Sequence, residues 1–304
     1  MRKNSGKAGT GVMSDAVLSK KLGHYQRMQR TWFVIGVIGA LCGVIAFFAV
    51  PDRAAKAILT AVLFGGGCFC AVILSERARK CGDALLQAQL GDFFQTEFER
   101  LFGPELRTDA LRIDEALMRM LAPADGAWES CSVERFHAGT HDGAAFSAAN
   151  VRLEHVYRVH KPQEGDETCR DEVFRGLVVR CRTHAPVASA LCVNARTENS
   201  PRGMQTGSEP FDSRFCVAAD AGAVLTPQCM DFLLALDDGV EGRLCALRWE
   251  ADILTLAFET DYGFAAVASG VDRHDLDAVR KSYISSLRTM AELLDRLRQI
   301  PLPV

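Results

Sequence analysis

Two long stretches of this 304-residue sequence lack charge altogether. No Asp, Glu, Lys or Arg occurs in residues 31–50, and none occurs in residues 57–74. A helix needs about 20 apolar residues to cross a hydrocarbon core about 30 Å thick. Helices buried in a soluble core rarely avoid polar residues for so long, because one face usually meets water. The two uncharged stretches therefore predict two transmembrane helices joined by a short turn.

A secretory signal peptide is the alternative explanation of the first uncharged stretch. Signal peptides have a short basic leader, and a second apolar stretch does not normally follow them. Here 30 residues precede the first stretch, and only six residues separate it from the second. The pattern therefore favours a transmembrane hairpin.

The sequence also lacks the motifs of several enzyme classes. No G-x-S-x-G nucleophile elbow occurs, and the glycine-rich segments lie in the N-terminal tail and in the second stretch, away from any strand-to-helix turn. We therefore predict no catalytic residue and no cofactor-binding residue. The net charge of −3 and the scattered basic residues do not suit nucleic acid, so none is expected as a partner.

Cysteine pairs with metal-site spacing are absent from the sequence after residue 74. The chain has eleven cysteines, an odd number, and most are scattered through strand-like and helix-like runs. A free cysteine in such a run behaves as a small hydrophobic residue. An oxidising compartment would tend to mispair a set like this one. The cysteines therefore favour a reducing compartment.

Positive charge gathers at the two outer ends of the expected hairpin. Seven Lys and Arg residues and one acid precede the first stretch, and Arg77, Arg79 and Lys80 follow the second. The turn between the stretches carries only Arg53 and Lys56. Positive charge near membrane ends stays on the cytoplasmic side. Both termini and the main domain are therefore expected in the cytoplasm.

Small residues recur at short intervals in both uncharged stretches. They let helix backbones approach closely in lipid, where no hydrophobic force drives helices together. We expect them to pack the two spans against each other, and dimerisation through the same faces is the alternative. The spans contain no acidic or basic residue, which argues against a solute pathway. The small residues in question are Gly39 and Gly43 in the first stretch, Ala61 and Gly65 in the second, and Gly67 and Ala71 further along it.

The pattern along the chain predicts an α+β protein in four parts. These are a basic tail with a juxtamembrane helix over residues 1–30, two spans over 31–74, a helical connector over 75–124 and a cytoplasmic α+β domain over 125–304. In the connector, apolar residues at helical spacing predict helices over 83–102 and 109–121.

From residue 129 onward the pattern changes to short strands separated by turn-like segments. Closely spaced strands with short links favour a mostly antiparallel sheet, which a small-barrel or PH-like closure would complete. Residues 160–171 and 197–212 are expected to be loops.

Two helices are expected within and after these strands. Thr226 and Pro227 suit the N-cap and the first position of a helix that ends at Gly239. Apolar residues spaced by three or four predict a long amphipathic helix over 275–300. This last helix either covers the sheet or pairs with a partner helix, and covering the sheet is the commoner use.

The best group of potential metal ligands surrounds a short turn. His137 and His141 lie on one expected strand and His155 on the next, so a hairpin would bring two of them together. Zinc needs three or four such ligands about 2 Å from the metal. The turn residues between the strands explain the same segment without a metal. These histidines are therefore only weak candidates, and no metal site is predicted.

Four segments follow one another in an order typical of a known family. They are "GTHDGAAFSAANVRLEHVYRV", "VFRGLVVRC", "FDSRFCVAADAGAVLTPQCMDFLLAL" and "LTLAFETDYGF", with the hairpin before them and the last helix after them. Over nearly its whole length the chain resembles the bacterial family called domain of unknown function 3137. The resemblance implies a bacterial inner-membrane protein and supplies no catalytic residues.

These observations predict a membrane-anchored cytoplasmic interaction or scaffold protein. Its expected partners are the lipid bilayer and either other proteins or further copies of the chain. A membrane-bound enzyme whose site is assembled from scattered residues is one alternative. An oligomeric membrane complex formed through the glycine-rich spans is the other.

Overall fold

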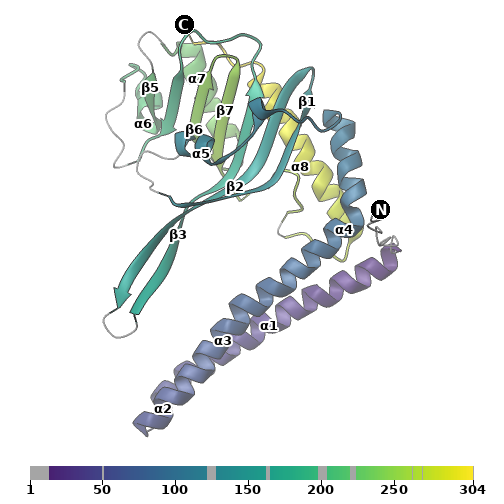
Figure 1. Ribbon diagram of the computed structural model, residues 1–304, viewed down its shortest axis with the longest axis vertical. Coiled ribbons are helices and arrows are strands. Elements are labelled where there is room, and N and C mark those ends of the chain that lie inside the picture. The colour runs from purple at the N-terminus through teal and green to yellow at the C-terminus, as the bar shows by residue number, and fades with distance from the viewer. Residues whose placement is uncertain are drawn as a thin grey trace, which may run out of the picture. The chain divides into compact units, whose positions relative to one another are not determined.

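The chain folds into two compact units. The first contains residues Met1–Gln95 and Gly270–Lys281, and the second contains Thr96–Ser269 and Ser282–Val304. The computed structural model describes residues 14–49, 51–121, 128–161, 165–197, 204–219, 224–261, 263–268 and 270–303. Long helices make up the first unit, and a sheet with helices on both faces makes up the second (Figure 1).

The first unit is built on two helical arms joined by a short turn. The first arm is one helix, so the juxtamembrane helix and the first span are continuous. Pro51 interrupts it, and Asp52 then caps the second arm by accepting a hydrogen bond from the backbone N–H of Ala54 at 2.9 Å. The segments are α1 (Asp15–Ala49), α2 (Arg53–Thr60), the π-helical η1 (Ala61–Gly65), α3 (Gly66–Phe69), the π-helical η2 (Cys70–Leu74) and α4 (Ser75–Phe102).

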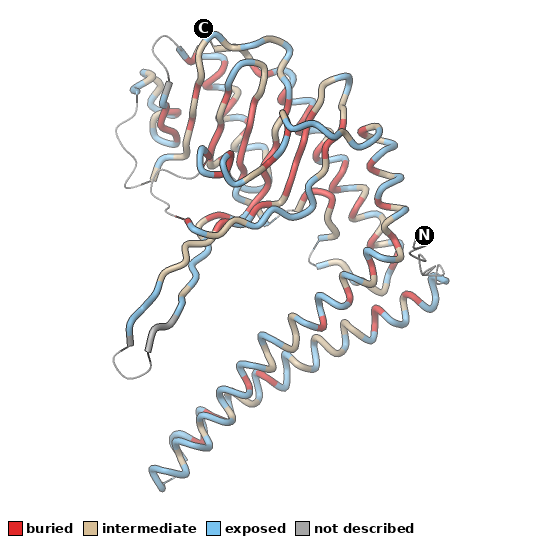
Figure 2. The backbone as a smooth tube through the Cα atoms, in the orientation of Figure 1, coloured by how far each residue is buried: buried red, intermediate tan, exposed pale blue. Residues whose placement is uncertain are grey.

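Both arms are long and apolar enough to cross a membrane. Of the 18 most apolar consecutive residues in the first arm, only 17% are buried. In the second arm the corresponding share is 6%. Figure 2 shows the arms mostly exposed. These arms are consistent with membrane anchoring, because helices of a soluble core would be mostly buried.

The second unit is a sheet of seven strands in the order β1-β2-β3-β7-β6-β4-β5. All neighbouring strands are antiparallel, as predicted. The strands β1 and β5 are the two edges, so the described sheet is open and a barrel-like closure is not confirmed. The strands are β1 (Ser130–His141), β2 (Ala144–Lys161), β3 (Gly165–Arg182), β4 (Leu191–Ala195), β5 (Phe215–Ala219), β6 (Arg243–Glu250) and β7 (Ile253–Glu259).

One face of the sheet lies under the short helix α5 (Glu115–Leu121). The predicted helix over 109–121 is wrong in its first half, where a single 3-10 turn, η3 (Asp109–Leu111), is followed by a break. Asp114 ends that break by capping α5, because its side chain accepts from the backbone N–H of Leu117 at 3.0 Å. The buried cluster on this face contains Ile113, Leu117, Met118, Leu121, Trp128, Ala149, Val151, Leu153, Phe174, Val178, Ala246 and Ala257.

The opposite face lies against α7 (Pro227–Gly239) and α8 (Leu276–Leu297) (Figure 1). Side chains of α8 from residue 282 onward border the same small cavities as Phe146 and Leu177 of the sheet. The apolar stripe of this helix is buried, so it covers the sheet as expected. The buried residues of this part of α8 are Tyr283, Leu287, Met290, Leu293, Leu294 and Leu297.

The strands β2 and β3 extend as a two-stranded ribbon beyond the rest of the sheet (Figure 1). The pairing of β1 with β2 stops at Glu154, and that of β7 with β3 begins at Gly176. The prediction of a loop over 160–171 is therefore wrong for the described residues 160, 161 and 165–171. The sequence of residues 160–171 is mostly polar and turn-forming, so it shows no apolar alternation from which a strand could be predicted.

The helix α7 begins as its sequence predicts. The side chain of Thr226 accepts a hydrogen bond from the backbone N–H of Cys229 at 3.2 Å, and Pro227 occupies the first turn. The cap stabilises an otherwise unpaired backbone donor at the helix start.

Replacing Thr226 with Ala should lower the free energy of unfolding of the sheet unit by about 1 kcal/mol, because the cap is lost. Thr226→Ser keeps the hydroxyl and should stay close to the parent chain. Thermal unfolding of both variants in detergent measures the difference. Equal midpoints for the Ala and Ser variants would contradict the assigned cap.

Candidate functional site

The two apolar arms contact each other through glycine. A Cβ placed on Gly36 would lie 2.5 Å from the backbone nitrogen of Ala71, and one placed on Gly67 would lie 2.5 Å from that of Ala40. Gly43 faces Phe64 in the same way, with 2.8 Å to its backbone nitrogen. No larger side chain fits between backbones this close. The arms are therefore held at a separation that only glycine allows.

The structure brings only some of the predicted packing residues to the contact between the arms. Gly39 lies at the contact, 3.2 Å from the Cα of Gly67 by the same measure, whereas a Cβ on Gly65 would meet nothing within 4 Å. Ala61 is exposed. Residues 65 and 67 are about 200° apart around a helix, so Gly65 points away when Gly67 faces the first arm. The packing face of the second arm therefore includes Gly67 and Ala71 in place of Gly65.

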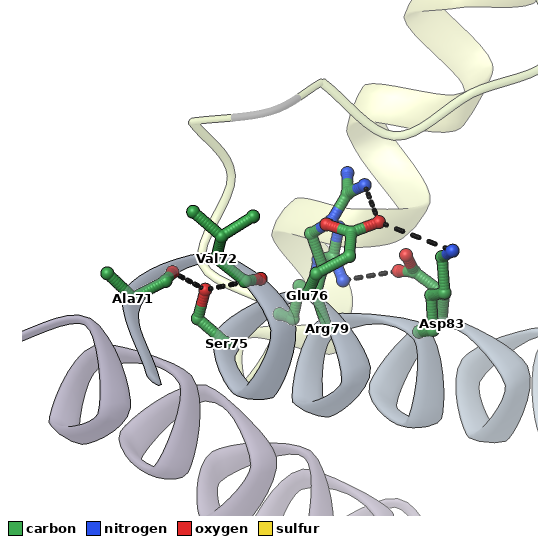
Figure 3. A network of polar contacts seen from close by, with 8 residues as sticks. Ala71, Val72, Ser75, Glu76, Arg79 and Asp83 are labelled. Carbon is green, nitrogen blue, oxygen red and sulfur yellow. Dashed lines mark hydrogen bonds and ion pairs between the residues drawn. The ribbon is translucent and has the colours of Figure 1, made fainter. Parts of the chain in front are cut away.

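Side-chain hydrogen bonds form on the second arm just after its apolar stretch ends. Ser75 donates from Oγ to the backbone oxygen of Ala71 and to that of Val72 at 3.4 Å. The next residue, Glu76, accepts two hydrogen bonds from Arg79, at 2.7 and 2.9 Å. Figure 3 shows these contacts along one side of the helix. The Arg79 side chain lowers the pKa of Glu76, so that carboxylate stays charged.

The segment 270–281 is bound to the outer ends of both arms within the first unit. Arg273 forms an ion pair with Asp83 of α4, and Arg280 forms one with Asp15 of α1 at 3.0 Å. His274 donates from Nδ1 to the backbone oxygen of Ser19 at 3.1 Å, and the Ser19 hydroxyl donates back to the backbone oxygen of His274 at 2.7 Å. We call segment 270–281 and its contacts with α1 and α4 the clamp. Its residues lie far apart in the sequence.

A glycine makes the clamp possible on the first arm. A side chain at Gly23 would overlap the ring of His274, so only glycine lets the imidazole lie against the α1 backbone. Leu18 and Leu22 are buried on the same part of α1. The juxtamembrane portion of α1 is therefore a packed element rather than a free helix.

The three candidate histidines do not converge on one site. His137 pairs with Ala148 across the β1–β2 register, whereas His155 lies beyond the end of that pairing, next to Glu129 at 3.0 Å. Seven residues of strand separate Ala148 from His155, which is about 23 Å at the usual rise of about 3.3 Å per residue. The structure therefore contradicts the expectation that a β-hairpin would bring two of these histidines together.

His141 belongs to a different polar group. Its Nε2 lies 2.8 Å from a carboxylate oxygen of Asp295, and Asp142 beside it forms an ion pair with Arg298 at 2.5 Å. His141, Asp142 and Asp295 are the one set of potential metal ligands within reach of one another among the described residues. Arg298 already neutralises one of the two carboxylates. The group therefore fits a surface ion-pair network better than a cation site.

Three cysteines of the sheet unit are poorly suited to nucleophilic catalysis. All eleven cysteines of the chain are free. Burial raises the pKa of Cys181 and of Cys229 to about 12, and that of Cys245 to about 11. The thiolate is the reactive form of cysteine, so these protonated thiols are inert in the folded chain.

A polar row crosses the sheet on the face of α5. Arg180 of β3, Thr255 of β7 and Arg248 of β6 lie side by side in the register. Arg180 donates to the backbone oxygen of Arg112 at 3.1 Å, its Nε is buried without a described partner, and burial lowers its pKa. Glu250 binds Arg248 at 3.0 Å. The carboxylates of Asp114 and Glu250 also lie near Arg180, so two negative charges accompany the two guanidinium groups of the row.

An open groove of about 400 Å³ lies where β6 begins and β7 ends, beside the middle of β3. An enzyme would bring titratable groups together in a deep pocket. The carboxylates of this groove do not approach one another closely enough to form a set of metal ligands among the described residues. The groove is lined by Glu172, Arg175, Glu241, Gly242, Glu259, Thr260 and Asp261.

Comparison with known proteins adds little to this geometry. No protein-family model matches the chain, and no curated protein matches it. Among solved structures, the crystal structure of the mycobacterial trehalose monomycolate transport factor A, TtfA, is similar over 71% of this chain and 97% of that chain. The TM-score is 0.31 and the sequence identity 11%, so this similarity carries no argument about fold or function. The family resemblance noted in the sequence stays a prediction.

Gly67 and Gly65 provide a matched test of the arm contact. Gly67→Ala should destabilise the paired arms by about 1–3 kcal/mol, because its Cβ would meet the backbone of α1. Gly65→Ala has open space and should be neutral or stabilising by up to about 1 kcal/mol, because Ala favours helix. The thermal midpoint of each full-length variant in mild detergent gives the comparison. A thermal midpoint of the Gly67→Ala variant equal to or above that of the parent chain would contradict the contact.

Acid should destabilise the sheet unit through His137. Its ring lies between Phe98 and Phe264, with centroids 4.9 and 5.9 Å away. Burial, and to a lesser extent Arg135, holds the pKa of His137 below its ordinary value of 6.5, with Glu105 opposing. Because the folded-state pKa is the lower one, the unfolded chain binds the proton first as pH falls. The free energy of unfolding therefore decreases below about pH 6.5, and His137 does not lower it above that pH.

We expect His137→Phe to flatten part of this pH dependence, because it keeps an aromatic ring and removes the titration. Thermal midpoints of both chains between pH 7 and pH 5 measure the effect. His184→Phe is the control, since His184 is exposed and should leave the parental slope intact. Equal slopes for the parent and the His137 variant would exclude His137 as the source.

Proposed function

We propose that this protein is a membrane-anchored interaction or scaffold protein of the bacterial inner membrane, with its sheet unit and both termini in the cytoplasm. The observation that carries the proposal is the pair of helical arms, each with a long uncharged stretch, which pack through glycine and leave the apolar side chains of these stretches exposed. Outside a bilayer this surface would be an aggregation hazard. Inside a bilayer it needs no further partner.

The charges beside the arms support the orientation. Arg27 and Arg30 precede the first apolar stretch, and Arg77 follows the second, whereas the turn contains only Arg53 and Lys56. The bias of Lys and Arg near the ends of spans sets orientation. The proposed arrangement places the more basic ends in the cytoplasm.

The form of the sheet unit supports an interaction role rather than catalysis. Beyond Glu154 and before Gly176, β2 and β3 have only each other as described strand neighbours. A two-stranded ribbon is marginally stable by itself, and its free edges offer unpaired backbone groups to another protein. Binding by strand addition uses such edges. The buried thiols and separated histidines of the same unit do not assemble a reactive site.

Reporter fusions test the proposed anchoring and orientation. A fluorescent protein that matures only in the cytoplasm should fluoresce when fused to the C-terminus of the full chain. Alkaline phosphatase, which is active only outside the cytoplasm, should be inactive at the same position.

The matched control inserts the same phosphatase into the turn after Asp52, where it should be active. Reversed activities at the two positions would overturn the orientation. Extraction of the untagged chain from membranes by alkaline carbonate would overturn the anchoring itself.

A further inference from the structure

The outer edge of β2 continues beyond the end of β1 in the two-stranded ribbon (Figure 1). At the end of the β1 pairing, the backbone oxygen of Glu154 accepts from the backbone N–H of Glu129 at 3.0 Å. The backbone groups of alternate residues in an antiparallel strand point to the same side. Those of Val156 and Arg158 therefore point to the same side as those of Glu154, where β1 has ended.

The side chain of Glu129 already binds the first position of this edge. One of its carboxylate oxygens accepts from the backbone N–H of Val156 at 2.7 Å and lies 3.0 Å from Nδ1 of His155. The hydrogen bond from Val156 lowers the pKa of Glu129, so the carboxylate stays charged. The carboxylate thus takes the place of a strand carbonyl. At the next position, Arg158, the described part of the chain provides no strand on this side.

The two faces of β2 present different side chains along the edge. Arg158 is exposed and has no ion pair among the described residues. On the other face, Tyr157 stacks on His155 with 5.2 Å between ring centroids, and Val159 is 38% exposed. Residues 155–160 include no acid. A strand beside β2 would therefore meet a cation on one face and an aromatic and apolar row on the other.

We propose that the β2 edge beyond Glu154 binds, by antiparallel strand addition, an extended segment of another protein in which acidic and apolar residues alternate. The added strand would lie in line with β1, which is antiparallel to β2. Directly opposite residues of such a pair share a face. An acidic residue bonded to the Arg158 backbone would therefore also face its guanidinium, and the apolar residues beside it would face Tyr157 and Val159. The inference rests on the proposed interaction role and names the class of partner.

A second copy of the chain is less suited to this edge. Paired with itself, the edge would offer no acidic side chain from residues 155–160 to the arginine of the other copy. Opposite charges placed across a strand pair stabilise it, and like charges destabilise it. The charge of the edge therefore favours a different, acidic strand.

Fluorescence anisotropy of a labelled peptide with the full-length chain in mild detergent tests the site. The probe is acetyl-Thr-Val-Glu-Val-Glu-Val-Thr-amide, and the comparison peptide has Lys in place of both Glu. The parent chain should bind the acidic probe in preference. Arg158→Glu should weaken that binding roughly fivefold, because opposite charges become like charges. Arg107→Glu makes the same change at an exposed residue outside the ribbon and should leave binding unchanged.

Two modified probes separate strand addition from attraction between charges. N-methylation of both Glu residues removes the N–H groups that would bond to β2, so binding should be lost. N-methylation of the Val residues removes N–H groups that would face away from β2, so binding should be kept. Equal binding of the two modified probes would overturn strand addition.

Three other outcomes would overturn the inference. They are no saturable binding of the acidic probe, equal binding of the acidic and basic probes, and equal weakening by the Arg158 and Arg107 substitutions. A dimer of the parent chain that the probe dissociates would assign the edge to a second copy instead.

The reporter fusions test the proposed function separately. A chain that is anchored and oriented as proposed but does not bind the acidic probe contradicts only this inference. Reversed reporter activities contradict the proposed function, whatever the peptide does.

Discussion

The close approach of two helix backbones at Gly36 and Gly67 is the contact on which the pairing of the two arms depends. In lipid, apolar side chains gain nothing by leaving their surroundings, so association relies on packing at short range. A glycine on each arm provides that range, and any Cβ at either position would meet backbone atoms of the other arm. The contact also defines the register of the arms, because it puts Gly36 opposite Ala71 and Gly67 opposite Ala40.

That register determines what lies at the outer ends of the arms. With Gly36 opposite Ala71, Gly82 lies opposite Tyr25, and the polar part of α4 runs beside the first turns of α1. Asp15 and Asp83, one on each arm, are then both within reach of segment 270–281. A chain segment far away in sequence thereby joins the first unit. Exposed ion pairs add little stability singly, so the buried Leu18 and Leu22 and the Gly23 contact supply the packing that the pairs orient.

Local patterns predicted those elements whose signals are local. The arms follow from the length of the uncharged stretches, and α7 from Thr226 and Pro227. The order of the strands does not, because β4 lies between β5 and β6, and such pairing is decided by packing across the whole sheet. Only the outer part of the ribbon was predicted as a loop, at the described residues 160, 161 and 165–171, because polar and turn-forming residues dominate that segment. Gly65 and Gly67 look alike in sequence, and only the position of the other arm distinguishes them. The separation of His137 from His155 likewise depends on a register that turn residues do not reveal.

Ion pairing separates the cations of the first unit that stabilise its structure from those that have no described carboxylate partner. Cations that order the clamp or the polar end of the second arm each have a carboxylate within reach, so their charge is neutralised inside the unit. Arg30 and Arg77 have none among the described residues, although Glu76 lies next to Arg77 in sequence. Successive residues of a helix point about 100° apart, so Glu76 faces the following turn, where Arg79 and Lys80 lie, rather than Arg77. Helix geometry therefore leaves Arg30 and Arg77, which flank the apolar stretches, without an ion pair among the described residues.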